Sequence, residues 1–493
     1  MIMRQIVVLS SVWVCLAIPK PSTSQSVVSQ RLGPREAAAI DSFVTATMRA
    51  RRVPGVAAAV IENGSVVYEK AFGLANLETE APVTLHSVFE LASLTKEFTA
   101  VAIMMLVEEG KVKLDAPISA YIDSTPAAWT RITVRHLLTH TSGLFAGGIV
   151  FSQGSPLMNI TTAQAFAFLT GARAVAPGEV GAYSDGGYFL LGMIIERASG
   201  TTYRDFIQRR IFTPLEMSET SLTDRRRVIK GRVATYEIAN GQVVNWRRDW
   251  DHELPSFFGV WSTVGDVAKW DASLLRHTLV PQAALDQMWS PARLSDGRDA
   301  LVDARQYGFG FRIDQIRGHP LVWHNGASGT ILLHFLDEPI SIVVLTNLAN
   351  TAGRHAPAIA DGIAGLIRQK YVPAQWLPPA PDAAPETTRA MQAVLTDMAA
   401  GRVSERMTAA HSAYLLALRP SMNEVFGRAL AGLETLTFIA CDDVSGKGIR
   451  ITEPIARMCY YKAMAGGRLT YFTFWLTPDN SVAHVRLSGP DEY

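Results

Sequence analysis

An apolar helical pattern that runs through Met105 begins with a serine and a lysine three residues apart, Ser93 and Lys96. If Ser93 occupies the first turn of that helix, both side chains lie on one face and their functional atoms can meet. A serine hydroxyl is a poor nucleophile until a base takes its proton, and a neutral lysine amine can be that base. Backbone N–H groups at the helix N-terminus favour a developing oxyanion. The spacing indicates nucleophilic catalysis, although a capping serine beside a surface lysine gives the same pattern.

The length and charge of the chain restrict the classes of function. A chain of 493 residues is long enough for about two or three domains, each with its own core. Lys and Arg total 46 against 45 Asp and Glu, which leaves a net charge of +1. Such a balance gives no electrostatic case for a nucleic-acid partner or an anionic membrane surface.

The first 24 residues have the pattern of an export signal. Arg4 supplies a positive charge, residues 6–18 are apolar, and small residues at 22–24 offer a cleavage site. The apolar run is too short for a comfortable membrane span, so we expect an exported protein, periplasmic or secreted, without a span after signal removal. A retained N-terminal anchor is an alternative, and Cys15 would be removed with the signal.

Alternating structural signals follow the signal segment. A helix is predicted at 34–52, a hairpin of strands at 56–61 and 65–71 around Asn63-Gly64, and then the helix that follows Ser93. Further strands are predicted at 307–313, 321–323, 330–335 and 341–346, with a closing helix at 358–370.

His136 and His140 are four residues apart on one predicted helix, which is a metal-ligand spacing. No Glu adjoins His136 as in the zinc-peptidase pattern, and no third ligand suggests itself. We therefore expect hydrogen-bonded structural histidines here, with no metal and no organic cofactor in the protein.

Two further segments carry groups suited to a catalytic site. Tyr183 and Asp185 fall on a Gly-rich turn just before a helix, where side chains commonly face a ligand, although a lone tyrosine in a turn often only packs. The segment from His324 to Gly329 joins two predicted strands, and its glycines let a substrate approach the backbone. An ordinary turn between strands is the alternative there.

Residues 371–386 are rich in Pro and Ala without apolar periodicity, which indicates a linker. Beyond it, residues 387–493 read as a small α+β domain, with helices at 387–401 and 405–418 and strands at 433–440, 449–451, 456–464, 469–476 and 481–487. Cys441 and Cys459 lie in this domain, where they can form a disulfide in an exported protein or remain two buried thiols. Its role is not readable from these residues.

Three motifs stand in order along the chain: Ser93-x-x-Lys96, Tyr183-Ser184-Asp185 and His324-Asn325-Gly326. Together they resemble the penicillin-recognising serine hydrolases, in particular the group of class C β-lactamases, D-aminopeptidases and related esterases. The flanking segments 135–144 and 188–192 are also similar to stretches of that family. The resemblance covers about residues 35–370, so we expect a hydrolase domain over 25–370. It implies an α+β fold, with an antiparallel sheet flanked by helices and a mostly helical subdomain.

The resemblance also implies roles for individual residues. Ser93 would be the acylated nucleophile, and Lys96 with Tyr183 would move protons. The backbone N–H groups of Ser93 and Ala327 would form the oxyanion hole. The remaining motif residues would bind substrate: Asp185, His324, Asn325 and Gly326.

Two positions depart from the β-lactamase pattern. Asp185 stands where the family often has Asn. If it is ionised and close to Lys96, it would hold Lys96 protonated and shift the base role towards Tyr183. It would also disfavour substrates that carry a carboxylate nearby. His324 stands where β-lactamases have Lys, and a histidine that titrates near ~6.5 is mostly neutral at physiological pH. We expect any activity on anionic substrates to improve as the pH falls below ~6.5.

The sequence thus predicts an exported serine hydrolase that forms an acyl-enzyme on Ser93 and acts on small esters or amides. D-amino-acid peptidase and weak β-lactamase activities are the alternatives within this class. A penicillin-binding or sensor protein with little turnover is the alternative of another class, and labelling of Ser93 by a serine-directed probe separates the two.

Overall fold

The computed structural model describes residues 31–144, 161–171, 175–223, 227–246, 255–303, 305–349, 355–417, 426–447 and 453–488. Over these ranges its main sheet has nine antiparallel strands in the order β3-β2-β1-β14-β13-β12-β11-β10-β9. Their bounds are β1 (Gly55–Glu62), β2 (Ser65–Asn76), β3 (Ala81–Pro82), β9 (Leu301–Val302), β10 (Arg305–Tyr307), β11 (Arg312–Ile316), β12 (His319–Gly326), β13 (Thr330–Phe335) and β14 (Ile340–Thr346). The early strand β1 pairs directly with the late strand β14, so both parts of the chain build one sheet.

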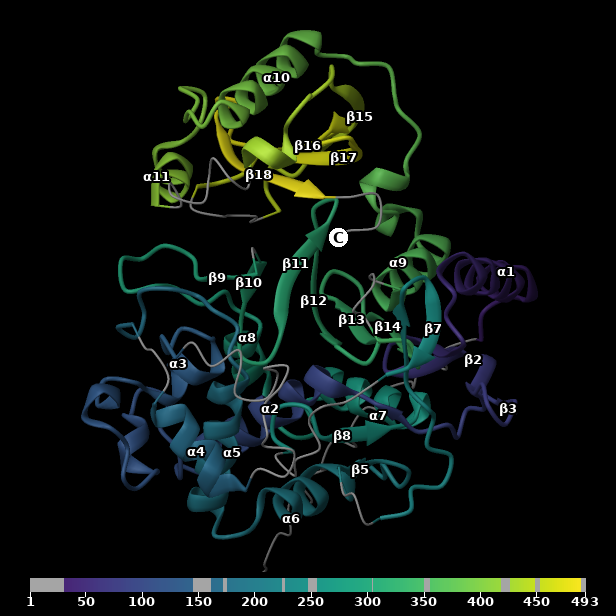
Figure 1. The fold of residues 1–493 in the computed structure, drawn as a ribbon, viewed down its shortest axis with the longest axis vertical. Coiled ribbons are helices and arrows are strands. Elements are labelled where there is room, and N and C mark those ends of the chain that lie inside the picture. Colours follow the sequence, from purple (N-terminus) through teal and green to yellow (C-terminus); the bar gives the residue numbers. More distant parts are fainter. Residues whose placement is uncertain are drawn as a thin grey trace, which may run out of the picture.

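Helices cover both faces of the sheet because its central strands are apolar on both sides. Along β1, Val56, Ala58 and Val60 belong to a core shared with α1 (Pro34–Arg51) and α9 (His355–Ile367). The alternate residues, Ala57, Ala59 and Ile61, belong to the second core, which α2 (Thr95–Glu108) and α7 (Val264–Leu275) complete. Figure 1 shows α2 and α7 between the sheet and the lower part of the molecule.

A mostly helical part lies beyond α2 (Figure 1). It contains α3 (Val134–Leu138), α4 (Thr162–Thr170), α5 (Asp185–Ser199), α6 (Tyr203–Ile207) and α8 (Gln282–Met288), with the short strands β4 (Phe89–Glu90), β5 (Ser221–Leu222) and β8 (Val260–Ser262). The hairpin of β6 (Tyr236–Ala239) and β7 (Gln242–Asn245) packs instead against the core shared with α1 and α9. Side-chain caps begin several of these helices; Ser184, for example, accepts a hydrogen bond from Gly187 N at 3.2 Å. Because α2 packs against α5, the Ser93 and Tyr183 segments face one another.

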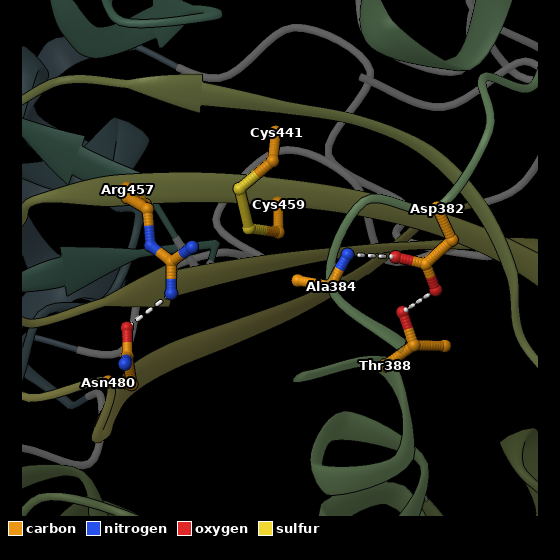
Figure 2. The surroundings of a disulfide bond; sticks show 7 residues. All are labelled: Asp382, Ala384, Thr388, Cys441, Arg457, Cys459 and Asn480. Carbon is orange, nitrogen blue, oxygen red and sulfur yellow. Dashed lines mark hydrogen bonds between the residues drawn. A yellow bond between two sulfur atoms is a disulfide. The ribbon is translucent and has the colours of Figure 1, made fainter. Parts of the chain in front are cut away.

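The C-terminal domain is a four-stranded antiparallel sheet, β15 (Thr437–Asp443), β16 (Arg457–Ala465), β17 (Arg468–Leu476) and β18 (Val482–Ser488). One face packs against α10 (Pro385–Ala399) and α11 (Ala409–Ala417). A disulfide joins Cys441 and Cys459, which lie opposite one another on β15 and β16 (Figure 2). Nearby, Asp382 accepts hydrogen bonds from Ala384 N at 3.0 Å and Thr388 Oγ1 at 2.6 Å, which fixes the start of α10.

The α+β class that the sequence predicted is confirmed, but some boundaries were wrong. The predicted strand at 307–313 is two strands, β10 and β11, separated by a turn. Gly308 and Gly310 explain the break: a Cβ on Gly308 would lie 2.0 Å from Met288 O, and one on Gly310 would lie 2.8 Å from Lys96 O. This turn therefore packs closely against α2. The predicted helix at 405–418 contains only α11, and the predicted strand at 449–451 lies outside the described residues.

Between the two domains, the predicted linker contains a short 3₁₀ turn at Ala374–Trp376, and Ala380 N donates a hydrogen bond to Ile439 O at 3.1 Å. This segment therefore runs along the C-terminal sheet. Among the described residues no helix has the length and apolar character to cross a membrane. The predicted export signal at 1–24, with Cys15, lies outside them.

Candidate active site

Ser93 lies in a 3₁₀ turn (Ala92–Leu94) directly before α2, and Lys96 lies in the first turn of that helix. Lys96 Nζ donates a hydrogen bond to Ser93 Oγ at 3.2 Å, so the structure brings together the pair that the spacing predicted. Ser93 is half-buried and Lys96 is completely buried. Ala92 has φ of 47°, a strained conformation for a residue with a Cβ, and such strain is concentrated at functional sites.

The turn between β12 and β13 packs onto the residues that precede Ser93. Two of its hydroxyls donate to main-chain carbonyls there, Ser328 Oγ at 2.6 Å and Thr330 Oγ1 at 3.0 Å. A Cβ on Gly326 would lie 2.2 Å from one of the same carbonyl oxygens, so only glycine permits this approach. Ala327 is the exposed residue of the turn. The predicted oxyanion-hole residues therefore come from two segments in direct contact.

Lys96 Nζ lies 2.7 Å from Asp185 Oδ1 and donates to Phe257 O at 3.0 Å. Burial alone lowers the pKa of Lys96, but the charges of Asp185 and then Tyr183 outweigh it and raise the pKa above the ordinary lysine value. Lys96 is therefore an ammonium at neutral pH. Asp185 is the first residue of α5, where the helix dipole also favours its negative charge. Because Lys96 carries the opposite charge, it offsets part of the repulsion that an ionised Asp185 exerts on a nearby carboxylate.

Tyr183 directly precedes the N-cap of α5 and is half-buried. Its ring centroid lies 4.8 Å from Lys96 Nζ and 4.4 Å from the centroid of the His140 ring. On another side the Arg312 guanidinium lies 5.5 Å from the same centroid. Tyr183 is thus held between two cations, beside the lysine that contacts Ser93.

His136 and His140 each have a hydrogen-bonded role in holding the chain. His136 Nδ1 accepts from Thr133 N at 3.2 Å, which caps α3. His140 Nδ1 accepts from Ser184 N at 3.1 Å, and burial keeps the pKa of His140 well below its usual value. His140 therefore fixes the segment that carries Tyr183 as a neutral ring. Across the described ranges, no group of three or more His, Cys, Asp or Glu side chains is placed to hold a metal ion.

His324 lies near the end of β12 and is buried, which corrects one expectation. Its Nδ1 donates to Asn325 O at 2.8 Å, and its Nε2 accepts from Tyr307 Oη at 3.0 Å. Burial, with the charges of Arg312 and Lys96, lowers the pKa of His324 well below 6.5. The predicted gain of positive charge just below that pH was wrong, because a buried ring beside two cations does not take up a proton there. Asn325 and Gly326 complete the strand, and Asn325 is half-buried.

Arg312, at the start of β11, was missed by sequence reasoning. Its Nη2 donates to Asp303 Oδ2 at 2.9 Å, and its buried Nε has no hydrogen-bond partner among the described residues. It pairs with Trp323, the neighbour of His324, across β11 and β12. Thus His324 replaces the lysine of β-lactamases, but Arg312 on the adjacent strand supplies a positive charge near it. Only the strand register reveals that Arg312 lies beside the third motif, and the wrong strand boundary at 307–313 concealed this position.

Comparison with known protein families gives a match to the family model described as beta-lactamase over residues 40–365. Penicillin-binding protein 4* of Bacillus subtilis (strain 168) is 30% identical over 311 residues, which are 58% of this chain and 66% of that protein. The D-aminopeptidase of Brucella canis is 26% identical over 352 residues, which are 69% of this chain and 65% of that protein. The chain thus spans just under two thirds of the length of these relatives.

Two solved structures share the fold. An octameric penicillin-binding protein homologue from Pyrococcus abyssi has a TM-score of 0.59 at 23% identity and covers 91% of this chain and 99% of its own. EstCE1, described as a hydrolase with promiscuous acyltransferase activity, has a TM-score of 0.58 at 21% identity and covers 67% of this chain and 99% of its own. The first likeness extends into the C-terminal domain.

Proposed function

This chain belongs to the β-lactamase family, and we propose that it is a serine hydrolase that forms an acyl-enzyme on Ser93 and acts on small esters or amides. The observation that carries the proposal is the contact of Lys96 with both Ser93, at 3.2 Å, and Asp185, at 2.7 Å. This arrangement supplies a nucleophile and a fixed positive charge beside it.

In the proposed reaction Ser93 Oγ attacks the carbonyl carbon while its proton passes to the Tyr183 oxygen. Lys96 is already protonated, so it does not take this proton; instead its ammonium, 4.8 Å from the Tyr183 ring centroid, stabilises the negative charge that Tyr183 must carry as a base. The N–H groups of Ser93 and Ala327 stabilise the oxyanion. Tyr183 then returns the proton to the leaving group, and water releases the acyl group by the same steps.

A second candidate class is substrates that carry a carboxylate, such as peptides of D-amino acids. Arg312 favours it, because its guanidinium lies 5.5 Å from the Tyr183 ring centroid with a buried Nε that lacks a partner among the described residues. Guanidinium groups bind carboxylates well in partly buried sites. β-Lactams, which also carry a carboxylate, come third, because this chain has His324 at the position where the third motif of β-lactamases has a lysine.

Export is also part of the proposal. The charged and apolar pattern of residues 1–24 supports it. A disulfide between Cys441 and Cys459 agrees with it, since disulfides persist mainly in oxidising compartments.

The test compares the wild type with Ser93→Ala and Tyr183→Phe on p-nitrophenyl butyrate, D-alanine p-nitroanilide and a chromogenic cephalosporin, with intact mass recorded after each. We expect ester turnover that Ser93→Ala abolishes and that Tyr183→Phe lowers about 100-fold or more. A stable adduct on Ser93 without turnover would instead identify a penicillin-binding or sensor protein. Equal turnover by wild type and Ser93→Ala would refute the proposed nucleophile.

A further inference from the structure

The hairpin of β11 and β12 connects the site with the C-terminal domain (Figure 1). Arg312 and Asp314 are two residues apart on β11 and point to the same side of the strand, where both are buried. Arg312 lies at the end beside Tyr183, and Asp314 lies further towards the hairpin tip. Arg312 therefore lies on the side of the candidate site, and Asp314 lies next to it on the side where the C-terminal domain docks.

Asp314 is a buried carboxylate shared between the two domains. Arg305 Nε, from β10, donates to its Oδ2 at 3.2 Å. Arg486, from β18 of the C-terminal domain, donates from Nη1 and Nη2 to its Oδ1, each at 3.3 Å. Burial alone raises the pKa of Asp314, but Arg486 and then Arg305 outweigh it and hold the pKa below its usual range. The carboxylate is ionised, and the C-terminal domain supplies one of its two counter-charges.

Removing Arg486 would leave this buried carboxylate with less positive charge than it needs. Uncompensated buried charges are costly, so nearby cations reorganise towards them. Arg312 is such a cation, since it is on the same side of β11 and its buried Nε has no partner among the described residues. Its guanidinium carbon lies 5.6 Å from the Trp323 ring centroid, and that of Arg305 lies 5.5 Å from it, so the two arginines share one aromatic neighbour.

We propose that Arg486 is a positioning residue for the active site: by pairing with Asp314, it leaves Arg312 beside Tyr183 to bind a substrate carboxylate. The C-terminal domain then sets the preference for anionic substrates from a distance, without contacting them. This inference rests on the proposed hydrolase function for its kinetic readout.

The test is Arg486→Met, which removes the guanidinium but keeps an apolar side chain near Trp475, whose ring centroid lies 5.2 Å from the Arg486 guanidinium. Two esters of similar size are compared, p-nitrophenyl butyrate, which is neutral, and p-nitrophenyl hemiglutarate, which carries a carboxylate. We expect kcat/KM for the anionic ester to fall about tenfold through KM, and kcat/KM for the neutral ester to stay within about twofold. An equal fall for both esters, or no change, would overturn the proposal.

Arg317→Met is the matched control. Arg317 makes another ion pair between the domains, with Nε and Nη2 donating to Asp442 at 3.0 and 2.8 Å at the hairpin tip. If Arg486 acts only by holding the domains together, Arg317→Met changes the ester ratio as much, and the proposal fails. If Arg486 acts through Asp314, the double variant Arg486→Met/Asp314→Asn regains the wild-type ratio, because the buried charge is gone. Absence of this rescue would also overturn it.

A binding measurement separates this inference from the proposed hydrolysis. In the Ser93→Ala background, calorimetric titration with the two esters measures the preference for the carboxylate without turnover. Arg486→Met should weaken binding of the hemiglutarate ester alone. If wild type does not hydrolyse either ester but this selective loss is seen, the hydrolase proposal fails and the positioning role of Arg486 stands. If the loss is absent, the positioning role fails whatever the turnover.

Discussion

Asp185 and Lys96 form an ion pair of 2.7 Å in which the lysine side chain is fully buried and the carboxylate is 9% exposed. The pair cancels two charges beside Ser93 and keeps Lys96 protonated. A lysine held in this way orients Ser93 and stabilises negative charge, but it does not accept a proton. We therefore propose Tyr183 as the base, in keeping with the prediction made from the Asp185 departure from the family pattern.

Asp185→Asn tests this pairing. The raised pKa of Lys96 means that its contribution to stability is fully present below the unfolded value of 10.5 and is lost as pH rises through the higher folded value. Without its counter-charge the buried ammonium is destabilising, so we expect the free energy of unfolding to fall by about 2–4 kcal/mol at neutral pH. The deficit should shrink at higher pH, where Lys96 loses its proton. Urea titrations at several pH values measure both effects.

Asp115→Asn is the control for that experiment. Asp115 pairs with Arg135 at 2.7 Å, but its side chain is 75% exposed. We expect a change of less than about 1 kcal/mol. A similar loss in both variants would mean that burial of the Lys96 pair contributes little.

The ratio of activities on anionic and neutral esters should not change between about pH 5.5 and 7.5, because His324 does not titrate there. Burial, Arg312 and Lys96 hold the pKa of His324 well below 6.5, so the ring stays neutral. Measuring kcat/KM for p-nitrophenyl butyrate and hemiglutarate at each pH tests this. A ratio that rises as pH falls through ~6.5 would show that His324 gains a proton in the working enzyme.

Glu97 follows Lys96 in sequence and is fully buried. Its Oε2 accepts from Trp270 Nε1 at 2.9 Å, and burial, with repulsion from Asp271, raises its pKa well above 4.5. The folded protein thus keeps this proton while the unfolded chain loses it above about pH 4.5, so the Glu97 contribution to stability falls as pH rises. Glu97→Gln should remove this pH dependence. We expect the stability of the variant relative to wild type to increase by about 1 kcal/mol or more between pH 5 and pH 8.

Urea titrations at both pH values measure the effect, with Glu108→Gln as the control. Glu108 is on the same helix but exposed, so Glu108→Gln controls for replacing a carboxyl with an amide on α2 outside the buried site. A Glu97→Gln variant with the wild-type slope would contradict a buried, protonated Glu97.

The disulfide between Cys441 and Cys459 closes a loop with a sequence separation of 18. Closing a loop of this length is worth about 3 kcal/mol in the chain-entropy account. We expect Cys441→Ala/Cys459→Ala to lower the melting temperature of the transition that includes the C-terminal sheet. Calorimetry with and without reductant measures this, and reductant should shift wild type but not the double variant. A reductant-insensitive wild type would show that the bond does not stabilise the domain.

The parts of the site that lie close in sequence could be predicted from it. Ser93 and Lys96 meet because helical spacing brings them together, and Tyr183 and Asp185 follow from the capped start of one helix. Arg312 and Phe257 could not be found in this way. Arg312 reaches Tyr183 through strand register, and Phe257 reaches Lys96 from a segment 161 residues away in sequence. The strand predicted at 307–313 failed for a related reason: Gly308 packs on Met288 O and Gly310 on Lys96 O, and these contacts come from segments distant in sequence.

The β12–β13 turn that packs on the Ser93 segment comes more than 230 residues later in the chain, since Ser328 contacts a carbonyl at a separation of 238. The proposed nucleophile is therefore synthesised early, while the turn that packs on its segment emerges much later. A chain that stops before β13, whether by truncation or during synthesis, carries Ser93 without Ala327, its proposed oxyanion-hole partner, in place. If Ser93 is the nucleophile as proposed, acylation requires completion of the sheet, and a partly synthesised chain is expected to be inactive.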